Sequence, residues 1–263
     1  MVSVVERKRW EVLGREFESN GCGTCVVLDY KNAKEVTVEF YEPRCTIVCE
    51  VSKLKKGQIK NPMKPSYYNK GYIGVGKYGF KDFNAYRTWQ SMLVRAYSDN
   101  YHKAKPTYKD VTVCEEWLNF QNFAEWFYHQ EFSEAKDENG NKYQLDKDLL
   151  GGESAMYSPE TCCFVPQDIN MLFTRKNSLR EKFVGVNFRK SSNKFQARIS
   201  CCGIDKHLGY FDEFEEAFKV FKINKEGLIK DLAEKWKFGI SKNVYETLLE
   251  FEVRLEPNEV CYG

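Results

Sequence analysis

The sequence contains no long apolar run and very few histidines. Its apolar stretches all fall well short of the roughly 18 residues that a membrane-spanning helix needs, so we expect no membrane contact. The N-terminal residues MVSVVERKRW contain no apolar stretch of the kind found in secretory signals, and we therefore expect a cytoplasmic protein. The only histidines are His102, His129 and His207, which restricts where an imidazole could act as a base or a metal ligand.

Cysteines are plentiful by comparison, since the chain has 10 of them. Without a secretory signal they are expected to remain thiols. Two pairs have spacing that suggests metal ligation, Cys22 with Cys25 and Cys45 with Cys49, and four thiolates can hold a structural zinc ion. The second spacing is less typical and no histidine is near, so we expect small buried residues of a β-rich segment and no zinc site.

The formal net charge of +2 conceals an uneven distribution of charge. Residues 51–109 carry 13 basic and 2 acidic side chains, residues 110–162 carry 3 and 12, and residues 163–209 carry 9 and 3. Lysines at 53–81 recur among glycine, tyrosine and asparagine, which suits phosphate contact because glycine allows close approach of the backbone. The alternative for this segment is a solvated linker. Two basic blocks separated by an acidic one favour separate DNA-contacting modules.

Hydrophobic periodicity predicts a modular α+β protein. β-branched segments between residues 10 and 60 predict a small barrel or curled sheet, and aromatic residues at helical spacing predict core-facing helices. The expected helices are 82–98, about 115–130, Asp168 to about Arg180, and about Asp212 to Trp236; the expected strands include 143–150, 184–190, 194–200 and 205–211. The expected modules are a small β-barrel at 1–60, a basic linker at 61–81, a helical and ββα module at 82–180, a three-stranded sheet with a helix at 181–239, and a C-terminal extension at 240–263.

The middle of the chain carries a long series of spaced residues. They are Trp89-x2-Met92-x2-Arg95, Tyr108, Val111-x-Val113-Cys114-x2-Trp117-x2-Phe120-x2-Phe123-x2-Trp126, Leu145-Asp146-Lys147-Asp148, Tyr157-Ser158-Pro159-Glu160-Thr161-Cys162 and Asn170. In these residues the segment resembles the homing-endonuclease-like proteins of bacteriophages, which are distantly related to HNH nucleases. In active HNH nucleases a hairpin and a helix hold one divalent metal, a histidine activates water, and Asn or His from the helix completes the site.

The resemblance implies candidate catalytic residues at Asp146, Lys147, Asp148 and Asn170, with Asp146 and Asp148 as ligands if Mg²⁺ is bound. Lys147 occupies the general-base position, where the phage family often has arginine, and no histidine lies in 143–170. A lysine is charged at neutral pH and cannot accept a proton unless its pKa is strongly lowered. Strand alternation would place Asp146 and Asp148 on one face and Lys147 on the other. We favour salt-bridging or hairpin-capping aspartates, and the alternative is an active nicking or homing endonuclease.

A second resemblance covers about 50 residues near the C-terminus. It is carried by Gly185-Val186-Asn187-Phe188-Arg189, Lys194-Phe195-Gln196-Ala197-Arg198-Ile199, Leu208-Gly209-Tyr210-Phe211 and Glu215-Glu216-Ala217-Phe218. This stretch resembles the AP2 domain, a three-stranded sheet packed on a helix, whose exposed face enters the major groove of DNA. Alternation predicts an apolar face of Val186, Phe188, Phe195, Ala197 and Ile199, and an outward face of Asn187, Arg189, Lys194, Gln196, Arg198 and Ser200. His207 stands where the family often has an aromatic contact residue.

Residues 10–60 resemble the small SH3-like barrels that precede such domains in phage proteins. Together these features predict a double-stranded DNA-binding protein with a degenerate nuclease centre, in the host cytoplasm if a phage encodes it. Phosphate contacts are expected from the lysines of 53–81, among them Lys53, Lys55 and Lys56, and base or backbone contacts from Asn187, Arg189, Lys194, Gln196, Arg198 and His207. A further alternative is an interaction protein that blocks a host protein during infection.

Overall fold

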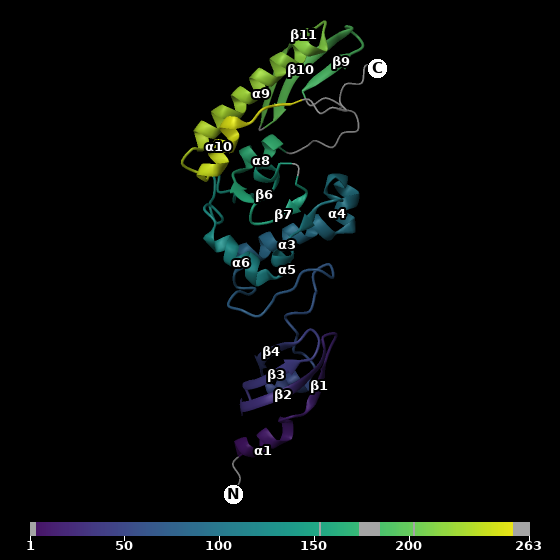
Figure 1. Cartoon of the computed structure of the whole chain (residues 1–263), viewed down its shortest axis with the longest axis vertical. Helices are drawn as coiled ribbons and strands as arrows, with labels where there is room; N and C mark the ends of the chain where they lie inside the picture. Colours follow the sequence, from purple (N-terminus) through teal and green to yellow (C-terminus); the bar gives the residue numbers. More distant parts are fainter. Residues whose placement is uncertain (1–3, 153, 174–184, 202, 255–263) are drawn as a thin grey trace. The chain divides into compact units, whose positions relative to one another are not determined.

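The computed structural model describes residues 4–152, 154–173, 185–201 and 203–254, and Figure 1 labels its helices and strands. These residues divide into two compact units. The first unit comprises the described residues up to Ser98 together with Val113–Glu125, and the second comprises Asp99–Thr112 and the described residues from Trp126 onward. The fold is mixed α and β, as the periodicity predicted. Within the described ranges, no helix has the length and apolar character needed to cross a bilayer.

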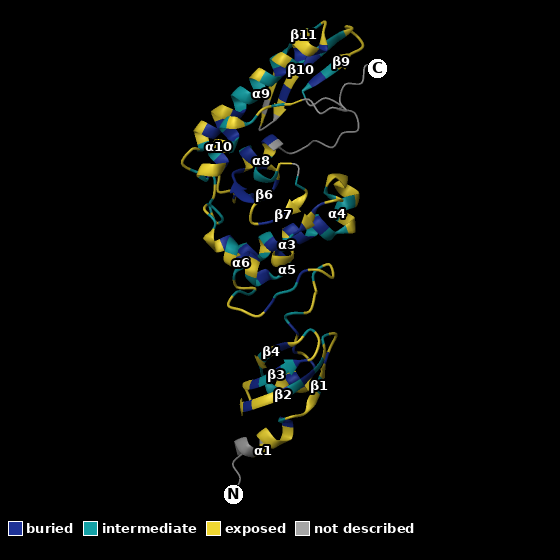
Figure 2. Ribbon diagram, in the orientation of Figure 1, coloured by how far each residue is buried: buried dark blue, intermediate teal, exposed yellow. Residues whose placement is uncertain are grey.

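The N-terminal sheet is an antiparallel meander with the order β1-β2-β3-β4. Its elements are α1 (Val4–Val12), β1 (Glu16–Ser19), β2 (Gly23–Asn32), β3 (Glu35–Phe40), β4 (Cys45–Cys49) and α2 (Val51–Lys55). Buried and exposed residues alternate along these strands (Figure 2), so that one face forms the core. The expected small barrel is an open sheet, since β1 and β4 do not pair with each other among the described residues. Val12 and Leu54, from α1 and α2, join the core cluster on the inner face.

The segment between α2 and α3 (Phe83–Tyr97) is anchored, in contrast to the linker that its composition predicted. The Gln121 side chain donates hydrogen bonds to the carbonyls of Ile73 and Tyr78, each at 2.9 Å, and accepts one from the N–H of Tyr78 at 3.0 Å. Gly74 has a φ of +76°, and a Cβ there would lie 2.0 Å from the Asn119 side-chain oxygen. The loop conformation therefore depends on glycine at this position.

The helix expected over 115–130 is divided into α5 (Glu115–Leu118) and α6 (Phe120–His129). The backbone of Tyr72 lies beside the break, where its N–H donates to the carbonyl of Leu118 at 2.8 Å and its carbonyl accepts from Phe120 at 2.9 Å. These bonds occupy groups that an unbroken helix would pair internally, which explains the interruption. Most aromatic residues expected in the core are buried there, namely Trp89, Trp117, Phe120, Phe123 and Phe127. Phe83 differs from the expectation, since it stands at the first residue of α3 and is 60% exposed.

The second unit contains short central elements followed by a sheet and two helices. They are α4 (Asp99–Ala104), η1 (Pro106–Tyr108), β6 (Gln144–Asp146), α7 (Asp148–Gly151), β7 (Met156–Tyr157), β8 (Cys163–Val165), α8 (Gln167–Phe173), β9 (Val186–Arg189), β10 (Lys194–Cys201), β11 (Ile204–Phe211), α9 (Phe214–Trp236) and α10 (Lys242–Glu250). The short strand β5 (Thr112–Val113) lies at the boundary between the two units. β6 pairs antiparallel with β8. The helix expected from Asp168 corresponds to α8, and its predicted continuation beyond Phe173 lies outside the described residues.

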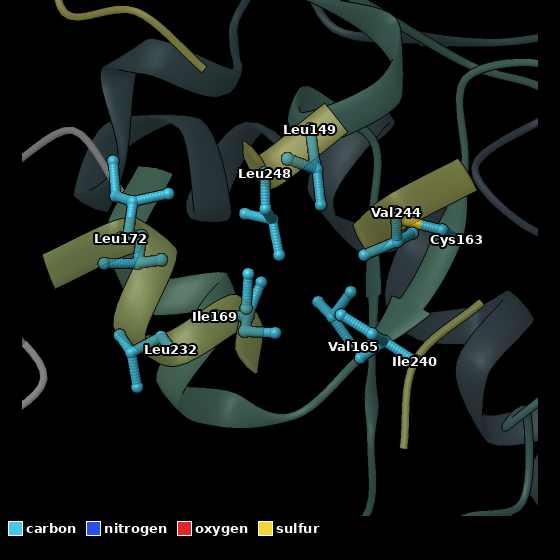
Figure 3. Packing of buried hydrophobic residues seen from close by; sticks show 11 residues of the cluster. Leu149, Cys163, Val165, Ile169, Leu172, Leu232, Ile240, Val244 and Leu248 are labelled. Atoms are coloured by element: carbon cyan, nitrogen blue, oxygen red, sulfur yellow. The ribbon is translucent and has the colours of Figure 1, made fainter. Parts of the chain in front are cut away.

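One hydrophobic cluster connects the short central elements to the C-terminal helices (Figure 3). Leu149 from α7, Val165 from β8 and Ile169 from α8 pack against residues of α9 and α10, such as Leu232 and Leu248. Each fully buried aliphatic side chain of this cluster stabilises the folded state by roughly 1.5–3 kcal/mol. The short strand pair β6–β8 is thereby held by helices that follow it much later in the sequence.

The three strands expected near the C-terminus form an antiparallel sheet with the order β11-β10-β9, and it packs on α9. Val186, Ala197 and Ile199 face the helix, as alternation predicted. Phe188 differs from the expectation, since 46% of its surface is exposed, although its ring lies 5.1 Å from that of Phe195. Phe188 is on β9, an edge strand, where neighbouring residues cover less of a side chain.

Candidate nucleic-acid interface

The outward face of β9–β11 gathers most of the residues that the sequence singled out for DNA contact. Register pairs Lys194 with Arg189, and Gln196 with both Asn187 and Tyr210. A shift of register after Ala197 then places Arg198 opposite His207. Because cross-strand partners project from the same side of a sheet, all of these side chains share one face. Arg189, Arg198 and His207 are exposed, and Asn187 and Lys194 are half-buried.

Gln196 lies at the centre of this face, but only 8% of its surface is exposed to solvent. Alternation had predicted a solvated position. Its Oε1 accepts a hydrogen bond from Arg189 Nε at 2.7 Å. Its Nε2 lies 3.1 Å from His207 Nδ1 and 3.5 Å from the Tyr210 hydroxyl. The neighbours that it binds also cover it, so Gln196 orients Arg189 and His207 instead of reaching solvent itself. Tyr210 belongs to the motif that resembles the AP2 domain, but the sequence does not predict it as a contact residue; its position opposite Gln196 in the strand register is the signal for that role.

Two of the three cations on this face have carboxylate partners there. Lys194 Nζ lies 2.9 Å from an Asp212 carboxylate oxygen, and the Arg198 guanidinium makes two hydrogen bonds to Asp205, one of them at 2.5 Å. The bond to Asp205 raises the pKa of Arg198 further above its ordinary value. Arg189 has no carboxylate partner within the described residues. Arg189 is therefore the cation on this face with the least competition for an anionic ligand.

Asp146 occupies a structural position at the end of β6. Its Oδ1 accepts hydrogen bonds from the N–H groups of Asp148 at 3.1 Å and Leu149 at 2.8 Å, where α7 begins. Burial nevertheless raises the pKa of Asp146, because water no longer stabilises its charge. The expected alternation is wrong here, since Asp146 and Lys147 are both buried and Asp148 is exposed. The strand ends at Asp146 and a helix follows, so period two no longer applies.

The other candidate catalytic residues also have partners within the fold. Lys147 Nζ lies 2.5 Å from Asp148 Oδ1 and 5.9 Å from the centre of the Tyr157 ring. Asn170, in α8, donates a hydrogen bond to the Gln144 side chain. A hard cation prefers several converging carboxylate or carbonyl oxygens, whereas here an ammonium group lies against one carboxylate and backbone N–H groups bind the other. These residues do not fit an Mg²⁺ site, and their contacts agree with a capping and ion-pairing role.

The cysteines of the N-terminal unit do not fit a zinc site either. Cys25 and Cys45 are buried in the sheet, and burial raises the pKa of the Cys25 thiol to about 11. Burial likewise raises the pKa values of Cys45 and Cys49. Zinc lowers the pKa of the thiols that bind it, so the placement of the side chains decides whether they fit the ion. Across the described residues, no group of three or more His, Cys, Asp or Glu side chains is arranged to hold a metal ion.

The lysines expected to contact phosphates begin in α2. Lys53 lies 3.1 Å from Glu50 and Lys55 lies 3.6 Å from Glu11, so both have exposed carboxylate partners. Lys56 follows at the C-terminus of the helix and has no carboxylate partner among the described residues. Surface pairs of this kind are weak, at about 0–1 kcal/mol, and a phosphate can compete for either lysine.

The outer face of the N-terminal sheet is acidic. Glu16 and Glu39 both pair with Val26 in the strand register, and Glu18 pairs with Thr24, so their carboxylates share one face. Asp29 lies on the same face, opposite Thr37. A row of carboxylates repels phosphate, which argues against this face as a second surface for DNA.

Comparisons with known proteins leave the three resemblances as predictions. No protein-family model matches the chain, and neither the curated proteins nor the solved structures contain a match to it.

Proposed function

We propose that this protein binds double-stranded DNA through the outward face of β9–β11. The observation that carries the proposal is Arg189, an exposed arginine without a carboxylate partner in the described chain, held by the buried Gln196 on a face that also presents Arg198 and His207. A narrow antiparallel sheet with cationic and amide side chains on one face suits the major groove, whose base edges and bordering phosphates accept hydrogen bonds.

The hydrogen bond from Nε to Gln196 leaves the two Nη nitrogens of Arg189 as the donors for DNA. Arginine binds guanine O6 and N7, or two phosphate oxygens, with a pair of parallel hydrogen bonds. A guanidinium that is already held loses less side-chain entropy on binding, which favours affinity. Gln196 Nε2, an amide nitrogen that can only donate, lies 3.1 Å from His207 Nδ1, which leaves His207 Nε2 as a second donor for DNA.

Lys194 and Arg198 would supply phosphate contacts by exchanging their aspartate partners for DNA. Their pairs with Asp212 and Asp205 are solvent-exposed, and such pairs contribute only about 0–1 kcal/mol. Binding to DNA also releases condensed counterions, which adds a favourable term that an internal aspartate does not provide. The exchange is therefore favourable at low salt and becomes less so as the salt concentration rises.

The proposal does not include hydrolysis of DNA, because Asp146, Lys147, Asp148 and Asn170 are all engaged in contacts that support the fold. The test is a fluorescence anisotropy titration of a mixed-sequence duplex, with and without Mg²⁺, together with incubation of supercoiled plasmid with Mg²⁺ or Mn²⁺. We expect binding in both conditions and no nicking. Nicking that disappears in Asp146→Ala would establish an endonuclease instead.

Pull-down from nuclease-treated host lysate tests the interaction-protein alternative. A single stoichiometric host protein, combined with no measurable affinity for the duplex, would contradict DNA binding.

A further inference from the structure

A tight turn in the first unit presents an aromatic side chain in an unfavourable backbone conformation. The N–H of Lys70 donates to the carbonyl of Tyr67 at 3.0 Å, and the two central residues, Tyr68 and Asn69, both have a φ of 54°. These are the features of a type I′ turn, whose central positions favour glycine, asparagine and aspartate. Asn69 suits its position, whereas tyrosine at position 68 is strained because its Cβ crowds the backbone.

Contacts within the fold do not account for tyrosine at this position. Its side chain is 43% exposed, and it makes no hydrogen bond, ion pair or ring contact with any described residue. Backbone strain of this kind persists where the side chain has another use, and such residues cluster at binding sites. Tyr68 is therefore a candidate for contact with a ligand.

Two further aromatic rings are exposed along the same segment. Phe80 and Phe83 are 66% and 60% exposed. The Phe80 ring lies 5.1 Å from that of Tyr86 in α3, and the Tyr86 ring lies 6.2 Å from that of Tyr67 at the start of the turn. These ring contacts join Phe80 to the turn that carries Tyr68, and Phe83 follows three residues after Phe80 at the start of α3. We call Tyr68, Phe80 and Phe83 the aromatic surface.

The aromatic surface is held in place by hydrogen bonds on either side. The hydroxyls of Tyr67 and Tyr86 bond to each other, which fixes the turn against α3. The carboxylate of Asp82 accepts from the N–H of Gly79 at 2.7 Å, and Gln121 binds both backbone groups of Tyr78. The rings are therefore presented by an ordered backbone, which lowers the entropy cost of stacking a ligand on them.

The charge around these rings is mostly positive, since the one carboxylate close to them in the sequence, that of Asp82, is bonded to the N–H of Gly79. Lys70 lies in the turn and Lys81 lies between the two phenylalanines, and neither has a carboxylate partner among the described residues. The Arg87 guanidinium lies 5.7 Å from the centre of the Phe83 ring. Exposed flat rings among unpaired cations complement a ligand with flat apolar faces and a negative backbone, which is the description of a single-stranded nucleic acid.

We propose that the aromatic surface stacks on unpaired bases of single-stranded DNA, with Lys70, Lys81 and Arg87 at the phosphates. This site belongs to the first unit and does not depend on the duplex-binding face of the second.

The experiment compares the affinity of the full-length protein for oligo(dT) and for an abasic oligonucleotide of equal length, which has the same phosphates but no bases. We expect oligo(dT) to bind about 10-fold more tightly, since stacking distinguishes the two. Tyr68→Asn places a favoured residue in the turn and removes the ring, so the melting temperature should rise while the preference for oligo(dT) falls. Adding Phe80→Ala to Tyr68→Asn should reduce the preference for oligo(dT) below that of the single variant. The affinity of Tyr68→Asn for duplex DNA should equal that of wild type.

Tyr41→Ala is the matched control, because it removes a tyrosine ring of similar exposure, 49%, beside the acidic sheet face. It should leave the preference unchanged. Equal affinity of wild type for the two oligonucleotides would overturn the proposal, as would a Tyr68→Asn variant with undiminished preference. A preference for oligo(U) over oligo(dT) would overturn the assignment to DNA.

Discussion

The two larger antiparallel sheets of the described chain, β1–β4 and β9–β11, have exposed faces of opposite charge. On the N-terminal sheet the outer face presents Glu16, Glu18, Asp29 and Glu39. On the C-terminal sheet the corresponding face presents Arg189, Lys194 and Arg198. Both sheets bury their other face in a hydrophobic core, so packing does not distinguish them. The side chains at the solvent-facing positions decide which sheet suits a polyanion, while the alternate positions maintain the fold.

Each face also carries a few side chains of the opposite charge, and these form ion pairs with some of the majority residues. On the acidic face Arg44 pairs with Glu39 at 2.9 Å, and on the basic face Asp205 and Asp212 pair with Arg198 and Lys194. Such pairs cancel part of the local field and leave particular residues without a counter-charge. On the basic face that residue is Arg189, which explains why we assign it the largest role.

The largest effect is expected from Arg189→Ala. Loss of a paired hydrogen-bonding contact to a base or phosphate costs about 1–3 kcal/mol, so duplex affinity measured by anisotropy should fall by roughly 10- to 100-fold. Arg44→Ala is the matched control, since it removes an exposed arginine from the acidic sheet. Equal effects of the two substitutions would remove the distinction between the faces.

Gln196→Glu should make the basic face resemble the acidic one. The new carboxylate would pair with Arg189 at the position of Oε1 and compete with DNA for the guanidinium, so we expect affinity to fall by about 10-fold, or ~1.4 kcal/mol. Gln196→Met keeps the size of the side chain without adding a charge, so its affinity for the duplex should fall less than that of Gln196→Glu. If Gln196→Glu binds the duplex as tightly as wild type does, a carboxylate at this position does not compete with DNA for Arg189. If Gln196→Met also binds as tightly as wild type, Gln196 does not position Arg189 for binding.

A further contrast concerns carboxylates, which are exposed on the acidic face but buried at Asp146. Asp146→Ala removes the acceptor for two N–H groups of α7 and should lower the free energy of unfolding by about 1 kcal/mol. Asp146→Asn retains an acceptor and no longer buries a charge, so it should be at least as stable as wild type at pH 7.

The pH dependence follows from the raised pKa of Asp146. The folded state binds a proton more readily than the unfolded state, so this residue's contribution to stability falls as pH rises from about 3.9, the ordinary value, through the raised pKa. The advantage of Asp146→Asn should therefore shrink as pH is lowered through that window. Urea unfolding at several pH values measures it, and an advantage that grew at low pH would contradict the buried charge.

The smallest effect is expected from Asp212→Asn, which removes the partner of Lys194 from the basic face. Duplex affinity should rise by about 2-fold, or ~0.5 kcal/mol, because an exposed pair of this kind is weak. A larger rise would indicate that Asp212 restrains binding more than its exposure suggests. A fall in affinity would mean that Asp212 supports the face in another way.

Period-two alternation predicted the exposed positions of Arg189 and Arg198, because β9 and β10 pair regularly up to Ala197 and Arg198 stays exposed beyond the register shift that follows. It could not predict the burial of Gln196, which depends on neighbours that lie opposite it on another strand. The ion pair with Asp205 likewise depends on the register of β10 and β11 beyond the irregularity after Ala197. Long-range register is not encoded in the periodicity of a single strand.

The predictions for the central segment and the N-terminus failed where one element gives way to another. Alternation was extended through Asp148, but the strand ends at Asp146 and a helix begins. The helix over 115–130 was predicted from its aromatic spacing, which does not report the backbone of Tyr72 beside Asn119. The β-branched pattern predicted the N-terminal strands but not whether their edges meet.

The salt dependence of duplex binding tests most directly whether DNA binds to the outward face of β9–β11. We predict that log Kd rises linearly with log salt concentration in wild type, and that Arg198→Ala reduces this slope by about 1, as expected for one lost phosphate contact. Arg44→Ala, from the acidic sheet, should leave the slope unchanged. An affinity that is insensitive to salt, or a slope that Arg198→Ala does not alter, would contradict binding through the face of β9–β11.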